Sequence, residues 1–192
     1  MHAVTLAGSV ARASRSERLL GIAAEYLSVR HVRVDRIAVR ELPPAALMHG
    51  DATDDAIVRA IDLVAQADVV IVATPVYKAA YSGVLKAFLD LLPQNALRDK
   101  AVLPIATGGS TAHMLAVDYA LKPVLAALGA RYVLGTVYVV DSDFAFIEGA
   151  GFQATNDVER RLDEGLAHLV KALHWTRQRK AGASLSPHVD SA

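Results

Sequence analysis

The chain has 192 residues, of which 53% are hydrophobic, and this favours one folded domain with a substantial core over a disordered chain. Twenty Lys and Arg balance twenty Asp and Glu, so neither nucleic acid nor an acidic membrane surface is indicated as a partner. The absence of cysteine excludes disulfides, thiolate catalysis and Cys-bound metals.

Strand-like and helix-like segments alternate along the chain. Apolar strands are predicted at residues 4–7, 32–39, 68–73, 101–107 and 132–140. Helices are predicted around residues 16–27, 57–64, 82–92, 111–128 and 162–173. The second strand is half polar, as at a sheet edge, whereas the third is unbroken and apolar, as in a strand buried on both faces. The prediction is a three-layer α/β sandwich with a five-stranded parallel sheet in the order 2-1-3-4-5.

Two segments fall outside this alternation of strands and helices, and one proline, Pro104, is unfavourable in the strand predicted around it. Residues 142–156 are predicted to form a long loop, and its three Phe favour a lid or an interface arm. Residues 1–176 are predicted to be a single domain, and residues 177–192 a disordered tail. Pro104 forfeits a backbone hydrogen bond in a predicted central strand.

The first loop that follows a strand, residues 8–16, has the composition of an anion site. It carries Ser9, Ser14 and Ser16 together with Arg12 and Arg15, and it leads into a helix N-terminus. No G-x-G-x-x-G turn or Walker lysine is present, so a phosphomonoester suits the loop better than a pyrophosphate. The alternative is that a serine only caps the helix while the arginines face solvent.

Two further loops, residues 74–83 and 107–113, are predicted to meet the first one at the carboxyl ends of the strands. Pro75, Val76 and Tyr77 offer a stiff, apolar wall for a flat polar heterocycle. Gly108 and Gly109 let backbone N–H groups approach ring carbonyls closely. A plain turn is the alternative for the glycine pair.

Pro123 lies inside the predicted helix 111–128. It has no N–H, so the carbonyl of Tyr119 loses its helical partner, and the helix must kink or widen around Asp118 and Tyr119. Widened π-type turns concentrate at functional sites. A proline kink with a core tyrosine is the alternative.

Other chemistries leave no pattern in the sequence. The seven histidines form no i, i+4 pair, and no G-x-S-x-G elbow occurs. The acidic pairs at Asp54–Asp55 and Asp141–Asp143 are interpreted as turn or helix-start carboxylates. No metal site is predicted.

Four segments together resemble the NADPH-dependent FMN reductases of the flavodoxin-like fold, nearest to the flavin reductases of two-component alkanesulfonate monooxygenase systems. They are residues 5–9 (Thr-Leu-Ala-Gly-Ser), 73–83 (Ala-Thr-Pro-Val-Tyr-Lys-Ala-Ala-Tyr-Ser-Gly), 103–109 (Leu-Pro-Ile-Ala-Thr-Gly-Gly) and 115–125 (Leu-Ala-Val-Asp-Tyr-Ala-Leu-Lys-Pro-Val-Leu). The resemblance extends over roughly residues 3–175. One departure is that many family members carry Arg two residues after the loop serine, where Ala11 stands here.

The resemblance implies a role for each loop. The FMN phosphate is expected at Ser9, Ser14, Arg15 and Ser16, although the shifted arginine leaves Arg12 as an alternative. The isoalloxazine is expected between two sets of residues: Pro75, Val76 and Tyr77 on one side, and Thr107, Gly108, Gly109 and Ser110 at its polar edge. Tyr119 matches a tyrosine that the resembling reductases insert to form a π-turn at a subunit interface, and it is the candidate catalytic residue.

The function that the resemblance implies is hydride transfer from NADPH to FMN, with FMN an exchangeable substrate. Reduced FMN is expected to pass to a partner monooxygenase of the alkanesulfonate type, in sulfur assimilation. A homodimer or homotetramer in the cytoplasm is expected. The lack of an acid–base constellation agrees with this, because hydride transfer needs stacking rather than a side-chain base.

Three alternatives stay open. The first is an FMN-retaining reductase of quinones, azo compounds or metal ions. The second is a flavodoxin-like electron carrier, against which the zero net charge argues. The third is a non-catalytic module that binds a phosphorylated metabolite.

Overall fold

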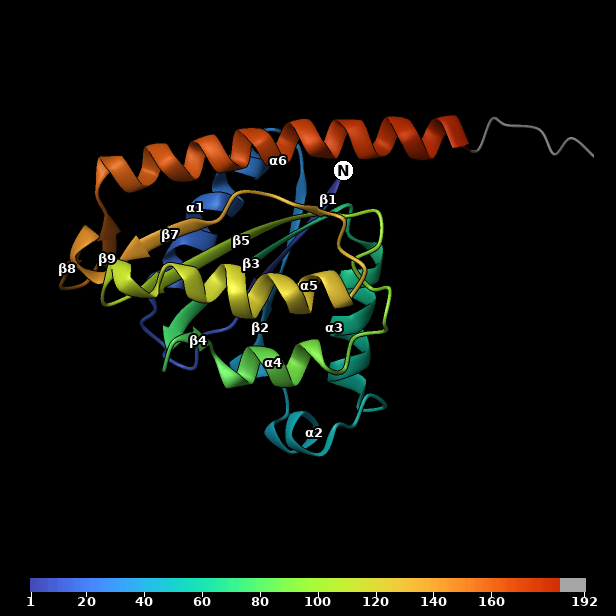
Figure 1. Cartoon of the computed structure of the whole chain (residues 1–192), viewed down its shortest axis with the longest axis horizontal. Helices are drawn as coiled ribbons and strands as arrows, with labels where there is room; N and C mark the ends of the chain where they lie inside the picture. Colours follow the sequence, from blue (N-terminus) through green and yellow to red (C-terminus); the bar gives the residue numbers. More distant parts are fainter. Residues whose placement is uncertain (184–192) are drawn as a thin grey trace, which may run out of the picture.

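The structure is a computed structural model that describes residues 1–183, with side chains described through residue 176. A mostly parallel sheet lies at its centre in the order β2-β1-β3-β5-β6; β7 also pairs with β5, and β4 pairs antiparallel with β3 (Figure 1). The strands of this sheet are β1 (His2–Ala7), β2 (Arg33–Ala38), β3 (Val69–Tyr77), β4 (Ala80–Tyr81), β5 (Ala101–Gly108), β6 (Tyr132–Val133) and β7 (Val137–Val140). The predicted order 2-1-3-4-5 is confirmed, with the fifth predicted strand divided into β6 and β7.

Helices cover both faces of the sheet and complete the three layers. They are α1 (Arg15–Ser28), α2 (Pro44–His49), α3 (Asp55–Gln66), α4 (Gly83–Leu89), α5 (Lys122–Ala127) and α6 (Asn156–Ala183), with short 3-10 turns η1 (Val39–Glu41), η2 (Thr111–His113) and η4 (Asp141–Asp143). One core cluster joins the sheet to α1 and α6, and the other joins it to α3, α4 and α5. Among the described residues, no helix is long and apolar enough to cross a bilayer.

The third strand shows why its sequence is an unbroken apolar run. Val69, Ile71 and Ala73 pack into the cluster with α1 and α6, while Val70 and Val72 pack into the opposite cluster. Successive side chains of a strand point to opposite faces, so a strand covered on both sides needs apolar residues at every position.

Pro104 is accommodated because the neighbouring strand is interrupted beside it. β5 pairs with β6 at Val102 and with β7 from Ile105 onward, and residues 134–136 between them are not strand. The Val102 carbonyl accepts the Leu134 N–H, and Pro104, two residues on, turns its backbone to the same side. The missing N–H of Pro104 therefore faces the gap, and this explains why the predicted strand 132–140 is broken.

The prediction of one helix over residues 111–128 is wrong at its start, whereas the predicted widening of the helix before Pro123 is confirmed. Residues 111–113 form the separate turn η2, because the Ser110 hydroxyl accepts the Ala112 N–H at 3.1 Å and caps it. A π-helix, η3, follows at Val117–Leu121, and the Lys122 N–H bonds to the Val117 carbonyl five residues earlier. Pro123 stands two residues after this turn, in the first turn of α5, where its missing N–H leaves the Tyr119 carbonyl without the usual partner.

Residues 142–156, predicted as a loop, contain a β-hairpin. β8 (Phe144–Ile147) pairs antiparallel with β9 (Gly151–Ala154), and Phe146 lies opposite Phe152. Aromatic cross-strand pairs stabilise such a ribbon. The hairpin lies beyond the arrowheads of β7 and β5 in Figure 1, at the carboxyl end of the sheet.

The C-terminal helix reaches into the segment predicted as a tail. α6 continues to Ala183. Residues 184–192 lie outside the described residues.

Candidate functional site

A cavity of about 130 Å³ opens where the loops after β1, β3, β5 and β7 meet. It is lined by Ser9, Ala11, Ala13, Ser14, Arg15, Pro75, Val76, Tyr77, Thr107, Gly108, Gly109 and Asp141. All of the predicted binding residues line it except Ser16 and Ser110. Ala11, Ala13 and Asp141 were not predicted, and the alanines have no polar side chain to signal them.

The first loop presents hydroxyls and the start of α1 to this cavity. Ser9 is buried, and its Oγ accepts the Ala11 N–H at 3.2 Å. Ser14 caps α1, since its Oγ accepts the Glu17 N–H at 3.3 Å and lies 3.0 Å from Ser16 Oγ. Ser16 is itself buried, and its hydroxyl is within hydrogen-bond distance of the Ser14 hydroxyl, which it helps to hold in place. A helix N-terminus with hydroxyls around it attracts anions such as phosphate.

Gly8 fixes this loop against its neighbours. A Cβ there would come within 2.9 Å of Leu85 Cβ and 3.3 Å of the Ala73 carbonyl oxygen, so only glycine fits. The Gly8 N–H donates to Ala73 O at 2.8 Å, and the Ser82 hydroxyl donates to Gly8 O. The loop is thus tied to β3 and to the start of α4, which preorganises it.

Arg15, rather than Arg12, lines the cavity; Arg12 is exposed. Arg15 Nη1 lies 3.5 Å from Asp141 Oδ1, and both side chains are partly exposed. Asp141 opens η4 directly after the last strand of the sheet. That position at the carboxyl end of a parallel strand is the signal that marks it as a site residue.

Gly108 gives the far wall its shape. A Cβ at Gly108 would lie 2.3 Å from the Tyr138 hydroxyl oxygen, and that hydroxyl donates to Ser110 O at 2.7 Å. Burial, and to a lesser degree the charge of Asp141, raises the pKa of Tyr138, so the phenol stays protonated and keeps this hydrogen bond. A Cβ at Gly109 would touch nothing within 4 Å, so close packing does not require that glycine.

The loop after β3 turns sharply beside the cavity. Lys78 and Ala79 have φ of +49° and +63°, the conformation of a two-residue type I′ hairpin turn, and they reverse the chain from β3 into β4. Thr74 braces the turn, because its Oγ1 accepts the Ser82 N–H at 3.0 Å and donates to Pro75 O at 2.9 Å.

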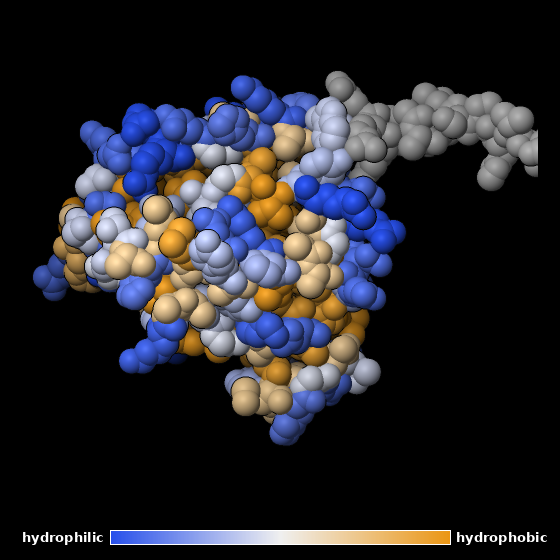
Figure 2. Space-filling model, viewed as in Figure 1, coloured by the Kyte–Doolittle hydropathy of each residue, from blue (hydrophilic) through white to orange (hydrophobic). Residues whose placement is uncertain are grey.

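Exposed apolar side chains stand on the same loops. Tyr77 is 47% exposed, Met114 51%, Leu115 54% and Tyr119, on the π-turn, 78%. The cavity is smaller than the ~300–1,000 Å³ typical of cofactor sites. Elsewhere, apolar surface over α4 and α5 is broken up by polar patches (Figure 2).

A charged network borders the first turn of α1. Arg36 and Arg40 each bond both Glu17 and Glu41. Burial opposes ionisation of Glu17, but the hydrogen bonds from Arg40 and Arg36 outweigh it and lower the pKa of Glu17. The two arginines and two glutamates of this network cancel in charge and do not line the cavity, whereas Arg15 is the cation among the lining residues.

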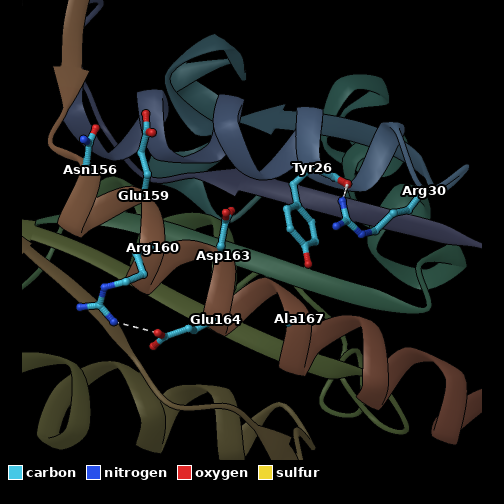
Figure 3. Close-up of a pocket in the computed structure, with 8 residues that line it drawn as sticks. All are labelled: Tyr26, Arg30, Asn156, Glu159, Arg160, Asp163, Glu164 and Ala167. Carbon is cyan, nitrogen blue, oxygen red and sulfur yellow. Dashed lines mark hydrogen bonds and ion pairs between the residues drawn. The ribbon is translucent and has the colours of Figure 1, made fainter.

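A wider hollow of about 600 Å³ lies between α1 and α6 (Figure 3). It is lined by Tyr26, Arg30, Asn156, Glu159, Arg160, Asp163, Glu164 and Ala167. Three acids outnumber two arginines, and Arg160 is already paired with Glu164 at 2.7 Å. Despite its greater size, this hollow suits an anionic ligand less well than the smaller cavity.

No metal centre is found within the part of the chain that the structure describes. No group of three or more His, Asp or Glu is placed there to hold an ion.

Comparison with known proteins gives concordant results. Residues 1–145 match the family described as NADPH-dependent FMN reductase. The chain is 48% identical over 174 residues to an FMN reductase (NADPH) of Pseudomonas putida, covering 90% of this chain and 88% of that protein. It is 47% identical to an FMN reductase (NADPH) of Escherichia coli, covering 91% of each.

A solved structure agrees in fold and sequence. The apo form of an NADH:FMN oxidoreductase (EMOB) superposes with a TM-score of 0.79 at 41% identity, covering 88% of this chain and 87% of that chain.

Proposed function

This chain belongs to the NADPH-dependent FMN reductase family, and we propose that it reduces FMN as an exchangeable substrate and passes reduced FMN to a partner flavin-dependent monooxygenase. The alkanesulfonate type of system, in sulfur assimilation, is the proposed setting. We propose the cytoplasm as the location of the protein, because the reaction consumes NADPH. The observation that carries the proposal is the cavity at the strand ends, in which serine hydroxyls, a helix N-terminus and Arg15 converge.

The residues present fit the phosphate of FMN. Ser9 and Ser14 offer hydroxyls, and Arg15 offers a guanidinium whose Nε is buried without a partner. A buried donor without an acceptor is costly, so a phosphate oxygen that reached it would stabilise the bound state. Ser16 acts indirectly by supporting Ser14.

The ring of FMN fits the remaining walls. Pro75, Val76 and Tyr77 give an apolar side, and Thr107 gives a polar side together with Gly108 and Gly109, at which no Cβ stands. Ser110 does not line the cavity; its backbone carbonyl accepts a hydrogen bond from the Tyr138 hydroxyl, which holds the loop in place. When bound, FMN would supply the ring that accepts a hydride from the nicotinamide, and Pro75, Val76 and Tyr77 would hold that ring in the pocket. The protein's task is to bind, orient and exclude water.

The flavin is proposed to be exchangeable because one protomer encloses so little of the ring. The cavity of about 130 Å³ leaves the ring side open. Tyr119 and the other exposed apolar residues of the rim then form the contact with a second subunit, in a homodimer or homotetramer. Tyr119 is proposed to control flavin retention from that contact.

The test is NADPH oxidation by thoroughly desalted protein, with and without added FMN, after the visible flavin absorbance is recorded. Colourless protein that oxidises NADPH only when FMN is supplied is the expected result. Yellow protein that needs only a quinone or azo acceptor would refute exchange and favour a retained flavin. NADH is run in parallel, since the similar solved structure is described as an NADH:FMN oxidoreductase.

The Tyr119→Ala variant tests the role of the π-turn. We expect it to hold FMN more tightly and to lose reduction of free flavin. A variant that purifies colourless and turns over normally contradicts that role.

A further inference from the structure

The guanidinium of Arg15 is held by two groups that the family resemblance does not assign. Its Nη1 lies 3.5 Å from Asp141 Oδ1, and its Cζ lies 4.5 Å from the centroid of the Phe152 ring on β9. Its Nε is buried with no hydrogen-bond partner. Arg15 therefore connects the loop after β1 to the hairpin β8–β9 and still has an unused donor.

We propose that Asp141 is a built-in competitor for the flavin phosphate, and that Phe152 positions Arg15 to choose between them. In the free protein Asp141 pairs with Arg15; when FMN binds, the phosphate displaces this pairing. Asp141 thereby weakens FMN binding and favours release. This inference rests on the proposed function, because it takes the cavity as the phosphate site.

The distance between Arg15 and Asp141 supports a displaceable pair. At 3.5 Å the contact is longer than the 2.7–2.9 Å of a charge-assisted hydrogen bond, and Asp141 is 43% exposed. Solvent screens such a pair, so breaking it is easy. Because Asp141 lines the same cavity as Ser9 and Ser14, its carboxylate also repels a phosphate dianion bound there.

The ring of Phe152 is well placed to hold the guanidinium of Arg15, because Arg15 Cζ lies over that ring. Phe152 packs edge-on against Phe144 and Phe146, with ring centroids 6.2 and 5.2 Å apart. A ring over the face of a guanidinium leaves the N–H groups at its edge free. An arginine oriented in this way presents its donors to phosphate as a fork.

The decisive measurement is the Kd of FMN and of riboflavin, by quenching of flavin fluorescence, for wild type and Asp141→Asn. Riboflavin has the same ring and no phosphate. We expect Asp141→Asn to bind FMN about tenfold more tightly, or ~1.4 kcal/mol, and riboflavin as wild type does. Asp143→Asn is the matched control, because it removes a carboxylate from the same turn at a residue that does not line the cavity, and it should change neither Kd.

The Phe152→Leu variant tests the positioning role. It keeps an apolar residue in the hairpin and removes the ring. We expect FMN to bind three- to fivefold more weakly with riboflavin unchanged, a difference that a general loss of structure would not produce. An unchanged FMN Kd would overturn the role of Phe152.

Failure of this inference differs from failure of the proposed function. If wild type prefers FMN to riboflavin but Asp141→Asn leaves the FMN Kd unchanged or raises it, the competitor role is wrong and the phosphate site stands. If Asp141→Asn tightens both flavins equally, the competitor role is also wrong. If wild type binds riboflavin as tightly as FMN, the phosphate site and the competitor role are both wrong, whereas the reduction of FMN is refuted only if desalted protein does not oxidise NADPH when FMN is supplied.

Discussion

Replacing Gly108 by alanine tests the geometry of the cavity wall. The added Cβ would lie 2.3 Å from the Tyr138 hydroxyl, which is held by its bond to Ser110 O, and Tyr138 is only 8% exposed. The phenol must move and lose its hydrogen bond, which costs about 1 kcal/mol, and the strain of adding a single methyl group contributes roughly 1–2 kcal/mol more. We expect Gly108→Ala to lose about 2–3 kcal/mol of unfolding free energy, or roughly 5–10 °C in Tm.

A double-mutant cycle with Tyr138→Phe isolates the clash. Once the hydroxyl is gone, the nearest atoms to the new Cβ are Tyr138 Cζ at 3.3 Å and Val76 Cβ at 3.6 Å, which need only small adjustments. Gly108→Ala should then cost under about 1 kcal/mol, a coupling of about 1–2 kcal/mol measured by urea denaturation. If the two substitutions are additive within error, the close approach of Gly108 to Tyr138 is not what requires glycine.

Three further changes probe the helices and the charged network. Pro123→Ala supplies the backbone N–H with which the Tyr119 carbonyl would bond in a regular helix. We expect a straighter helix and tighter retention of FMN, measured as flavin absorbance of the purified variant. Colourless variant protein would contradict this expectation. Because the pKa of Glu17 is lowered, its ion pairs stabilise the fold above the ordinary pKa of 4.5, and this stability is lost as the pH falls through the lowered value. We therefore expect the unfolding free energy of Glu17→Gln to fall less steeply with acidification than that of wild type. If both proteins lose stability equally as the pH falls, the ion pairs of Glu17 contribute nothing. Phe88→Ala removes a fully buried ring from the core beside α4 and should cost about 3–5 kcal/mol in denaturant melts, whereas a loss below ~1 kcal/mol would mean that the core refills the space.

Much of the fold is determined by patterns that physical rules translate directly. The unbroken, β-branched run of residues 69–73 is typical of a strand covered on both faces, and the missing N–H of Pro123 disturbs the regular hydrogen bonds of the turn before it. The cavity follows from the topology, because the carboxyl ends of parallel strands meet at one edge. For these reasons the strand order, the π-turn and most residues lining the cavity were predicted.

What sequence reasoning missed depends on contacts between distant segments. The hairpin at residues 144–154 has few residues per strand, and its stability comes from aromatic pairs that only form once the chain reverses. α2 is shorter than two turns, too short for a helical period to show. The position of Asp141 directly after the last strand marks it as a site residue, but its pairing with Arg15 is a contact between distant segments that the sequence does not show.

The two halves of the cavity differ in how much protein surrounds them, and this difference bears on whether flavin is kept or exchanged. On the phosphate side, Gly8 and Ser82 tie the loop to β3 and α4, so its donors are in place before any ligand arrives. On the ring side, Tyr77 and Tyr119 stand largely in solvent. Binding energy from a preorganised phosphate site selects FMN over riboflavin, while an open ring side leaves most of the flavin surface without protein contacts. Closing the ring side would add the contacts that one subunit lacks, which places a second control of flavin exchange in the assembly of subunits, beside the competition from Asp141 at the phosphate side.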